Sequence, residues 1–471
     1  MTTPVRRGEE ILLEISGAAF EGKSIARVEG MVVFVEGGVP GDRVRALVTK
    51  VKKQHAEARV LFVEHPSTLR TDPACVHFGT CGGCRWQHVS YPAQLEFKQM
   101  HVLDSLERIG GLQGFETLSI LGCEEPYWYR NKMEYSFAAS EWRDERPTEG
   151  EVANEGIFLG LHVPQRYDKV LDIQRCHLQS EPSNQILAVT REFARSSGLS
   201  VYSTERQDGF WRFLVIREAR HTDDRMVNIV TAEDRPEVMR EYAHTLTSRV
   251  KGITTIVNTL NKTRSQIAYG SEERVVVGPG TIQERLGPFE FTISAQSFFQ
   301  TNTLQAERLY ETVADFAGLS PEDVVYDLYS GTGSIAIYVS DRVRRVVGVE
   351  SSASAVKDAE ANALRSGRTN CRFVLGDLKD RLSDHTAWMG DEGKPRVVIT
   401  DPPRSGMHPD VVTALVHLGS ERIVYVSCNP ATQARDAKML VAGGYRLEKI
   451  RPVDMFPHTY HIENVAVFVK M

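Results

Sequence analysis

The chain has no long hydrophobic run, little net charge and few cysteines. No apolar stretch approaches the roughly 20 residues needed to cross a bilayer, and the first residues, Met-Thr-Thr-Pro-Val-Arg, lack the apolar core of a signal peptide. These absences predict a soluble, cytoplasmic protein without a membrane partner. The net charge of −6 and the pI near 6.2 give no global sign of nucleic-acid binding, so a basic surface would have to be local.

The seven cysteines of a cytosolic chain are more typical of metal ligands, catalytic groups or buried hydrophobes than of disulfides. Cys75, Cys81 and Cys84 lie close together among glycines, which let the backbone fold around an ion or a cluster. Cys176 is the best candidate for a fourth ligand because it follows a predicted strand outside the C-terminal half. Four thiolates suit either zinc or an iron-sulfur cluster.

At 471 residues the chain predicts about two or three domains. In residues 1–66, short apolar strands alternate with glycine turns, which predicts a small β-barrel. The predicted strands are Ile11–Ile15, Ile25–Val28, Met31–Val35 and Val44–Lys50. A group of basic residues there is either a phosphate-contacting edge or a solvated face; it consists of Arg43, Arg45, Lys50, Lys52 and Lys53.

Residues 67–289 predict a central α+β domain that carries the cysteine cluster. The cluster is followed by a predicted amphipathic helix, Pro92–Ile109. Glu141–Asn154 is polar and charge-rich, which predicts an exposed loop. No catalytic motif is recognisable in this region, so the chemistry is expected elsewhere.

Residues 290–471 alternate apolar strands with helical stretches, which predicts a doubly wound, mostly parallel sheet with its site at the carboxyl ends of the strands. The predicted helices are Thr303–Phe316, Ala353–Arg365 and His408–Val416. The predicted strands are Val324–Leu328, Arg345–Val349, Val397–Thr400, Ile423–Val426 and Val465–Val469. The whole chain is therefore expected to be a multidomain α/β protein.

Acidic residues follow successive predicted strands of this sheet. Asp327 precedes a Gly-x-Gly turn, where an acid suits a positively charged or amine-bearing ligand better than a pyrophosphate. Glu350 is placed to accept hydrogen bonds from the hydroxyls of a ribose, and Asp377 to face an adenine amino group. Asp401 begins an Asp-Pro-Pro-Arg motif, whose prolines fix the backbone at the pocket lip. A single acid of this kind could be a helix cap, but the series predicts a site for S-adenosylmethionine.

A thiol and a further carboxylate end neighbouring strand candidates. Cys428 lies in Ser-Cys-Asn-Pro after Ile423–Val426, and Glu463 lies in His-Ile-Glu-Asn before Val465–Val469. Carbon 5 of uracil is a poor nucleophile, so its methylation requires a thiolate to add to carbon 6 and a base to remove the proton from carbon 5 afterwards. Cys428 as nucleophile and Glu463 as base meet that demand. The target base would have to leave its stack to reach them.

The chain resembles the RNA (uracil-5-)-methyltransferase family over nearly its full length. The resemblance rests on Phe298–Asn302, the Asp327–Ala336 turn, Asp401–Arg404, Ser427–Pro430 with Arg435-Asp436, and His461–Val465. It implies that Cys428 and Glu463 are catalytic. The residues it implies for the pocket of the cofactor and target base are Gln300, Tyr329, Ser334, Glu350, Asp377 and Asp401. Ser334 departs from the family, because relatives often have Asn there.

The same resemblance extends to the other two regions. The N-terminal barrel looks like a TRAM domain, an OB-like RNA-binding module, and the C-terminal domain is expected to be Rossmann-like. The four cysteines look like ligands of a [4Fe-4S] cluster. This architecture implies 23S ribosomal RNA as the substrate and no obligate protein partner. The alternatives are a tRNA uridine methyltransferase, a methyltransferase of an exocyclic amine with a structural Cys428, and a non-catalytic RNA-binding or ribosome-assembly factor.

Overall fold

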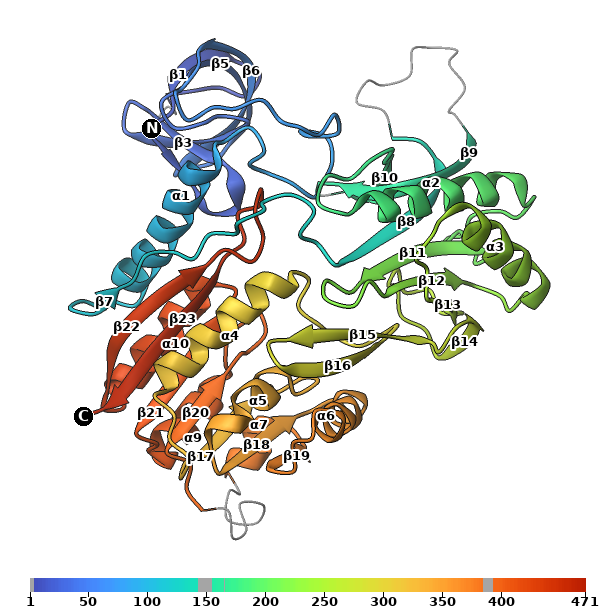
Figure 1. The fold of residues 1–471 in the computed structure, drawn as a ribbon. Helices are drawn as coiled ribbons and strands as arrows, with labels where there is room; N and C mark the ends of the chain where they lie inside the picture. The colour runs from blue at the N-terminus through green and yellow to red at the C-terminus, as the bar shows by residue number, and fades with distance from the viewer. Residues whose placement is uncertain (1–3, 143–154, 165, 384–392) are drawn as a thin grey trace.

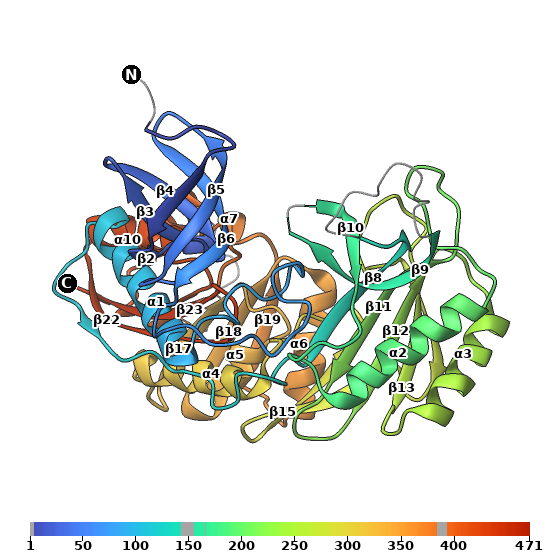
Figure 2. The same cartoon turned by 90° about the horizontal axis from the view of Figure 1, so that it is seen from above.

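The structure is a computed structural model, and it describes residues 4–142, 155–164, 166–383 and 393–471. Its strands form a six-stranded sheet, a seven-stranded sheet, a two-stranded hairpin and an eight-stranded sheet. The N-terminal strands lie on one side of the molecule and the seven-stranded sheet on the other (Figures 1 and 2). The predicted loop Glu141–Asn154 lies almost wholly outside the described residues.

The six N-terminal strands curl into a small barrel with the order β1-β5-β6-β4-β3-β2 (Figure 1). In β5, Val44, Ala46 and Val48 are buried while Arg43 and Arg45 are exposed, the alternation of a strand with one face in the core. The strands are β1 (Glu10–Glu14), β2 (Gly17–Ala18), β3 (Ser24–Val28), β4 (Met31–Glu36), β5 (Arg43–Val51) and β6 (His55–His65). β6 was not predicted; its alanine- and glutamate-rich start has low strand propensity, and three register shifts interrupt its pairing with β5.

The basic group on the barrel is largely ion-paired within the barrel. Arg43 and Arg45 both contact Glu64, at 3.6 and 2.9 Å, and Lys50 lies 3.8 Å from Glu57. Both interpretations of this group, a phosphate-contacting edge and a solvated face, remain compatible with these contacts.

A helix leads from the barrel to the edge of the eight-stranded sheet. α1 (Tyr91–Asp104) continues into a π-helical turn, η2 (Ser105–Ile109), so the predicted helix is present but changes its hydrogen-bonding pattern in its last five residues. β7 (Glu116–Thr117) then pairs with the last-but-one strand of the chain. The N-terminal half of the protein is thereby attached to the C-terminal sheet.

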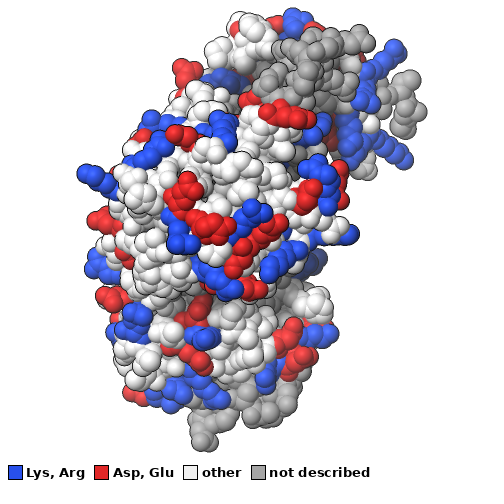
Figure 3. All heavy atoms as spheres, turned by 90° about the vertical axis from the view of Figure 1, so that its right-hand side faces the viewer, with Lys and Arg blue, Asp and Glu red and all other residues white. Residues whose placement is uncertain are grey.

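The central domain is a seven-stranded, mostly antiparallel sheet with the order β10-β9-β8-β11-β12-β13-β14. Two helices cover one face of it, α2 (Glu181–Ser196) and α3 (Pro236–Arg249) (Figure 2). The strands are β8 (Lys132–Ser140), β9 (Glu155–Val163), β10 (Arg166–Asp172), β11 (Trp211–Glu218), β12 (Arg225–Thr231), β13 (Thr255–Leu260) and β14 (Glu272–Val277). Over most of the face in Figure 3, acidic and basic side chains are interspersed, in keeping with the small net charge.

The C-terminal sheet has the order β19-β18-β17-β20-β21-β23-β22-β7. Five strands from β19 to β21 are parallel, as predicted. β23 is antiparallel to both of its neighbours, β21 and β22, a direction that the alternation of strands and helices in the sequence does not reveal. The strands are β17 (Val324–Leu328), β18 (Arg345–Glu350), β19 (Cys371–Leu375), β20 (Val397–Thr400), β21 (Arg422–Ser427), β22 (Tyr445–Val453) and β23 (Glu463–Lys470).

Two buried cores line the two faces of this sheet and fix the helices on it. Its helices are α4 (Thr303–Ala317), α5 (Ser334–Val339), α6 (Ala353–Arg365), α7 (Leu378–Ser383), α9 (Pro409–Leu418) and α10 (Pro430–Ala442). The hairpin β15 (Thr281–Leu286) and β16 (Phe289–Ser294) packs into the core that contains α4. None of the helices in the described residues is long and apolar enough to cross a membrane.

A buried carboxylate connects the barrel to the segment that leaves it. Asp42 accepts hydrogen bonds from the backbone N–H groups of Val39 and Ser67 and from the guanidinium of Arg70. Burial by itself raises the pKa of Asp42, but these donors outweigh it and hold the pKa below the ordinary value of 3.8. A carboxyl with a lowered pKa stabilises the fold above its unfolded pKa, and this contribution is lost as the pH falls through the folded pKa.

We therefore expect Asp42→Asn to lower the free energy of local unfolding of the barrel by about 1–3 kcal/mol at pH 7. The difference from the wild type should shrink as the pH falls below 3.8. Amide hydrogen exchange of β5 in the full chain measures it, with the exposed Asp208→Asn as the matched control. Equal protection of β5 in the wild type and in Asp42→Asn at pH 7 would contradict the expected role.

Candidate functional site

The turn between β17 and α5 has an unusual backbone. Tyr329 has a φ of 62°, in the left-handed region that bulky residues rarely occupy, and Gly331 and Gly333 have φ angles of 53° and 79°. A Cβ at Gly333 would lie 2.8 Å from the ring of Phe373, so glycine is required there by space as well as by conformation. Backbone strain of this kind is concentrated at functional sites.

Asp327 lies beneath this turn and is almost completely buried. Its Oδ2 accepts a hydrogen bond from the backbone N–H of Ala336 at 3.0 Å, whereas its Oδ1 has no partner among the described residues. Burial, and then the nearby carboxylate of Asp401, raise the pKa of Asp327 to about 8. A buried carboxyl with an unpaired oxygen is suited to a ligand that donates hydrogen bonds or carries positive charge.

Three of the predicted cofactor residues, Tyr329, Glu350 and Asp377, line one cavity of about 430 Å³ at the carboxyl ends of β17, β18 and β19. The Glu350 carboxylate accepts from the N–H of Gly331 at 3.0 Å and from the N–H of Ser352 at 2.8 Å. Asp377 accepts from the N–H of Lys379 in the first turn of α7 at 2.8 Å. Both acids therefore hold the cavity wall in place and retain acceptor capacity toward the cavity.

The sheet brings Cys428 and Glu463 to the same edge. Cys428 follows the last residue of β21, and Glu463 begins the antiparallel β23, where Ser427 pairs with Asn464. On α10, Gln433 donates to the carbonyl groups of both strands, at Tyr425 and Asn464, with distances of 3.0 and 3.2 Å. Gln433 thus links α10, which follows Cys428, to β21, which precedes Cys428, and to β23, which begins with Glu463.

The electrostatics of this group are dominated by burial. Burial and Asp401 raise the pKa of Glu463 well above its ordinary range, and Arg404 opposes them. Burial also raises the pKa of Asp401. Burial, and then Glu463 and Asp401, raise the pKa of the Cys428 thiol to about 12, again opposed by Arg404. The thiol is therefore neutral without a ligand, next to carboxyl groups that are unusually strong bases.

Arg404 was not assigned a role from the sequence, yet it is the cation that acts on Cys428 and Glu463. Its backbone carbonyl accepts from the Asn429 side-chain amide at 3.1 Å and from the Thr432 hydroxyl at 3.3 Å, so the Asp-Pro-Pro-Arg loop is tied to the start of α10. The signal was present in the sequence, because a cation follows the paired prolines directly.

The other predicted pocket residues, Gln300, Ser334 and Asp401, do not line the 430 Å³ cavity. Ser334 is the first residue of α5, with its hydroxyl 3.4 Å from that of Thr332. Gln300 is half-buried, and its carbonyl accepts from Asn131 at 2.9 Å. Ser334 begins α5 and Gln300 lies just before α4, so both stand near helix N-termini and not on the wall of that cavity.

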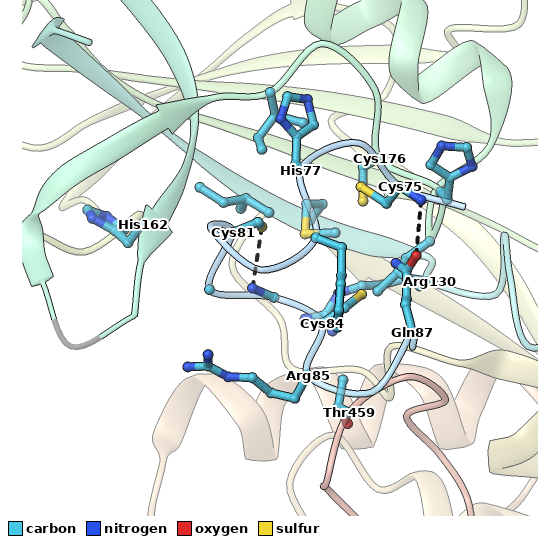
Figure 4. A pocket seen from close by; sticks show the side chains of 18 of the residues that line it. Cys75, His77, Cys81, Cys84, Arg85, Gln87, Arg130, His162, Cys176 and Thr459 are labelled. Carbon is cyan, nitrogen blue, oxygen red and sulfur yellow. Dashed lines mark hydrogen bonds between the residues drawn. The ribbon is translucent and has the colours of Figure 1, made fainter. Parts of the chain in front are cut away.

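Cys75, Cys81, Cys84 and Cys176 all line a second cavity, of about 660 Å³, between the loop after the barrel and the central sheet. Figure 4 shows their side chains around it, with Thr459 from the C-terminal domain at its edge. The N–H of Gly83 points to the sulfur of Cys81, at 3.4 Å. The four cysteines grouped together from the sequence therefore line a single cavity.

The four thiols do not form a ready-made metal site in this conformation. Among the residues that the structure describes, no group of three or more His, Cys, Asp or Glu side chains is arranged to hold a metal ion. Burial, and then neighbouring cysteines, raise the pKa of Cys81 to about 11 and that of Cys84 to about 12. All four are free thiols, so the predicted metal role stays a prediction.

Two family models match the chain. The model of the tRNA (uracil-5-)-methyltransferase family covers residues 223–471. The model of the TRAM domain covers residues 4–61, which confirms the expected identity of the N-terminal barrel.

Similar proteins support the same assignment over the full length. An uncharacterized RNA methyltransferase of Chlorobaculum tepidum is 42% identical over 99% of this chain and 97% of its own. Another, of Porphyromonas gingivalis, is 40% identical over 97% of this chain and 99% of its own. The crystal structure of Pyrococcus abyssi tRNA (uracil-54, C5)-methyltransferase with S-adenosyl-L-homocysteine is 29% identical, has a TM-score of 0.74 and covers 97% of this chain and 99% of its own. The chain therefore belongs to the tRNA (uracil-5-)-methyltransferase family, whose members are S-adenosylmethionine-dependent enzymes that methylate uracil in RNA.

Proposed function

We propose that this enzyme methylates carbon 5 of a uridine in 23S ribosomal RNA, with Cys428 as nucleophile and Glu463 as base. The observation that carries the proposal is the placement of these two side chains by adjacent antiparallel strands, next to Asp401 and Arg404. An amine methyltransferase needs an Asp-Pro-Pro-type loop but no thiol at this position. The thiol is what distinguishes carbon methylation.

The cavity lined by Tyr329, Glu350 and Asp377 fits S-adenosylmethionine by its hydrogen-bond acceptors. Glu350 would accept hydrogen bonds from a ribose, and Asp377 would face the adenine. Asp327 lies beneath the turn that carries Tyr329, and its unpaired Oδ1 would attract the positive end of the molecule. When bound, this cofactor supplies an electrophilic methyl group. Asp401, Ser334 and Gln300 complete the pocket toward the target base in this proposal.

Cys428 adds its sulfur to carbon 6 of the uracil, and the electron pair of the C5=C6 bond moves toward the carbonyl oxygen at carbon 4. The thiol must first lose its proton, which the raised pKa of about 12 opposes in the free enzyme. The adjacent carboxylate of Asp401 is the acceptor for that proton, which leaves Glu463 unprotonated for the later step, and Arg404 favours the resulting thiolate. Carbon 5 then becomes nucleophilic and takes the methyl group.

Glu463 completes the reaction by removing the proton that remains on carbon 5. The double bond re-forms, the sulfur–carbon bond breaks, and Cys428 leaves as a thiolate. The raised pKa of Glu463 suits this role, because a more basic carboxylate accepts a carbon-bound proton more readily. The same carboxyl group would be ineffective if it were exposed and had an ordinary pKa.

We further propose that Cys75, Cys81, Cys84 and Cys176 hold a [4Fe-4S] cluster. The support is that four soft donors from two distant segments line one cavity, with a backbone N–H directed at one of the sulfurs. Its place is at the junction of the loop after the barrel and the central domain. A cluster there would tie these parts together without taking part in methyl transfer.

The chain is proposed to divide into residues 1–66, 67–289 and 290–471, with the hairpin β15–β16 crossing the second boundary. The TRAM barrel and the central domain would bind the RNA. The four cysteines favour ribosomal RNA, because the resemblance to the 23S enzymes includes them. A tRNA substrate is the second candidate, since the similar Pyrococcus abyssi structure is that of a tRNA enzyme.

Nucleoside mass spectrometry of 5-methyluridine in separately purified 23S RNA and tRNA tests the function and the substrate. A strain without the gene should lose the nucleoside from 23S RNA, and the wild-type gene should restore it. Cys428→Ala should not restore it, because the turnover without a nucleophile falls by at least on the order of 10⁴-fold. The matched control, Cys371→Ala in β19, should restore it. Loss confined to tRNA would overturn the substrate assignment.

Glu463→Gln should trap a covalent protein–RNA adduct. The amide keeps the size of the side chain but cannot take the proton from carbon 5, so the sulfur–carbon bond cannot break. A denaturing gel with labelled RNA measures the adduct, and Glu448→Gln on β22, a half-buried glutamate paired with Arg422, is the control. Complete turnover by Glu463→Gln without an adduct would remove Glu463 from the role of base.

Protein purified without oxygen should contain about four iron and four sulfide ions per chain. Cys84→Ser should lose most of the iron, because one of the four ligands is removed, whereas Cys371→Ser should keep it. Elemental analysis and visible absorption measure both. Bound zinc without iron in the wild type would show that the four thiolates serve a zinc site instead.

A further inference from the structure

A fully buried ion pair joins α1 to the end of β22, next to the proposed base. Lys98 Nζ lies 2.6 Å from Asp454 Oδ1, and both side chains are 0% exposed. The Nζ also donates to the carbonyl of Phe456 at 3.0 Å, and Tyr91 Oη donates to Asp454 Oδ2 at 2.9 Å. Neither charge reaches solvent, so neither can contact RNA in this conformation. The mechanism described above uses neither of them.

The pair lies directly beside the strand position of Glu463. Val453, the residue before Asp454, is the register partner of Glu463 across β22 and β23. The Oδ1 of Asp454 also accepts from the N–H of Phe456 at 3.1 Å, and the Phe456 ring contacts that of His461 with 6.1 Å between centroids. A shift of Asp454 would therefore move both the strand end beside Glu463 and the residues that lead into it.

Residues 454–459, which we call the support segment, are held by the other parts of the molecule as well. In the first half, Asn302 donates to the carbonyl of Met455 at 3.2 Å, and Gln305 to that of Asp454 at 2.9 Å. Both donors belong to the start of α4. The segment is therefore attached to the C-terminal domain through its carbonyl groups.

The second half of the support segment contacts the central domain and the cysteine loop. Tyr129 Oη donates to the carbonyl of Pro457 at 3.1 Å. The N–H groups of Arg85 and Trp86 both donate to the carbonyl of His458, at 2.8 and 3.0 Å. His458 has a φ of 64°, a conformation that persists only because its neighbours determine it.

A single segment thus receives hydrogen bonds from α1, α4, the central domain and the cysteine loop. Among these donors, Lys98 is the one that donates from a cationic side chain, and that side chain is fully buried, so it is the contact whose loss the segment can least replace. Water could substitute for a lost hydrogen bond at an exposed position, but not at this one.

We propose that Lys98 and Asp454 are positioning residues, which hold the support segment and thereby hold Glu463 at the distance needed to remove the proton from carbon 5. The inference rests on the proposed function of Glu463. The inference assigns the ion pair to the second half of the reaction only. Resolution of the adduct, in which Glu463 removes the carbon-5 proton and Cys428 is released, depends on the pair, whereas formation of the adduct by Cys428 does not. A pair that served folding alone would affect both halves equally.

The test is single-turnover kinetics of the double variant Lys98→Met/Asp454→Asn on substrate RNA. Removal of both charges avoids the unpaired buried charge that either single change would leave. Misplacement of a catalytic group by about 1 Å costs on the order of 100-fold in rate, so adduct resolution should slow by about that factor while adduct formation stays within about tenfold. The adduct should therefore accumulate, as in Glu463→Gln.

The matched control is Arg225→Met/Glu218→Gln, which removes an equally short ion pair, 2.6 Å long and nearly buried, from the central sheet. It should change formation and resolution by the same factor. If the first double variant does not fold, as judged by circular dichroism, Tyr91→Phe replaces it. This variant removes only the hydroxyl that contacts Asp454, and it should slow resolution in the same direction by a smaller factor.

The outcomes separate the inference from the function on which it rests. If the wild type and Glu463→Gln form no adduct with RNA, the proposed function itself fails. If both behave as proposed but the double variant, or Tyr91→Phe in its place, resolves the adduct at the wild-type rate, the positioning role is refuted alone. Equal slowing of both half-reactions also refutes it, because that result indicates a purely structural pair.

Discussion

The antiparallel insertion of β23 between β21 and β22 is the constraint on which the proposed active site depends. A parallel strand would place its first residue at the opposite edge of the sheet. That residue would then be separated from the carboxyl ends of the other strands by the length of the strand, which is about 3.3 Å for each residue. Because β23 is antiparallel to β21, its first residue, Glu463, lies at the same edge of the sheet as Cys428, which follows the last residue of β21. The parallel strands build the cofactor cavity, and the reversed strand adds the base.

This arrangement concentrates acidic groups where water is excluded. Asp327, Asp401 and Glu463 all have raised pKa values, and burial is the first cause in each case. Arg404 is the cation that opposes the effect at Glu463 and at Cys428. Without a ligand, these buried acidic groups lack enough partners to stabilise their negative charge. A positively charged cofactor and a polar nucleobase would supply such partners on binding.

The sequence predicted β17, β18, β20, β21 and β23 of the C-terminal sheet, but not β22 or β7. The candidate site residues could be proposed because their motifs are local: Cys428, Glu463, Glu350 and Asp377 each follow or precede an apolar run. The antiparallel direction of β23 was missed. Alternating apolar runs do not show whether a connection crosses over to make the next strand parallel or turns back to make it antiparallel. Lys98 and Asp454 were missed for a related reason. They are 356 residues apart, and a buried lysine in an amphipathic helix looks like a solvated one until its partner is known.

The most direct test of the account uses RNA that carries 5-fluorouridine in place of the target uridine. Fluorine cannot leave carbon 5 as a proton, so the reaction should stop after methyl transfer. The account predicts a covalent complex whose intact mass equals protein plus RNA plus one CH2 unit, because a methyl group is added and the thiol proton is lost, with the RNA attached to Cys428 by peptide mapping. Attachment to another residue, or no covalent complex under conditions in which the unmodified RNA is methylated, would contradict it.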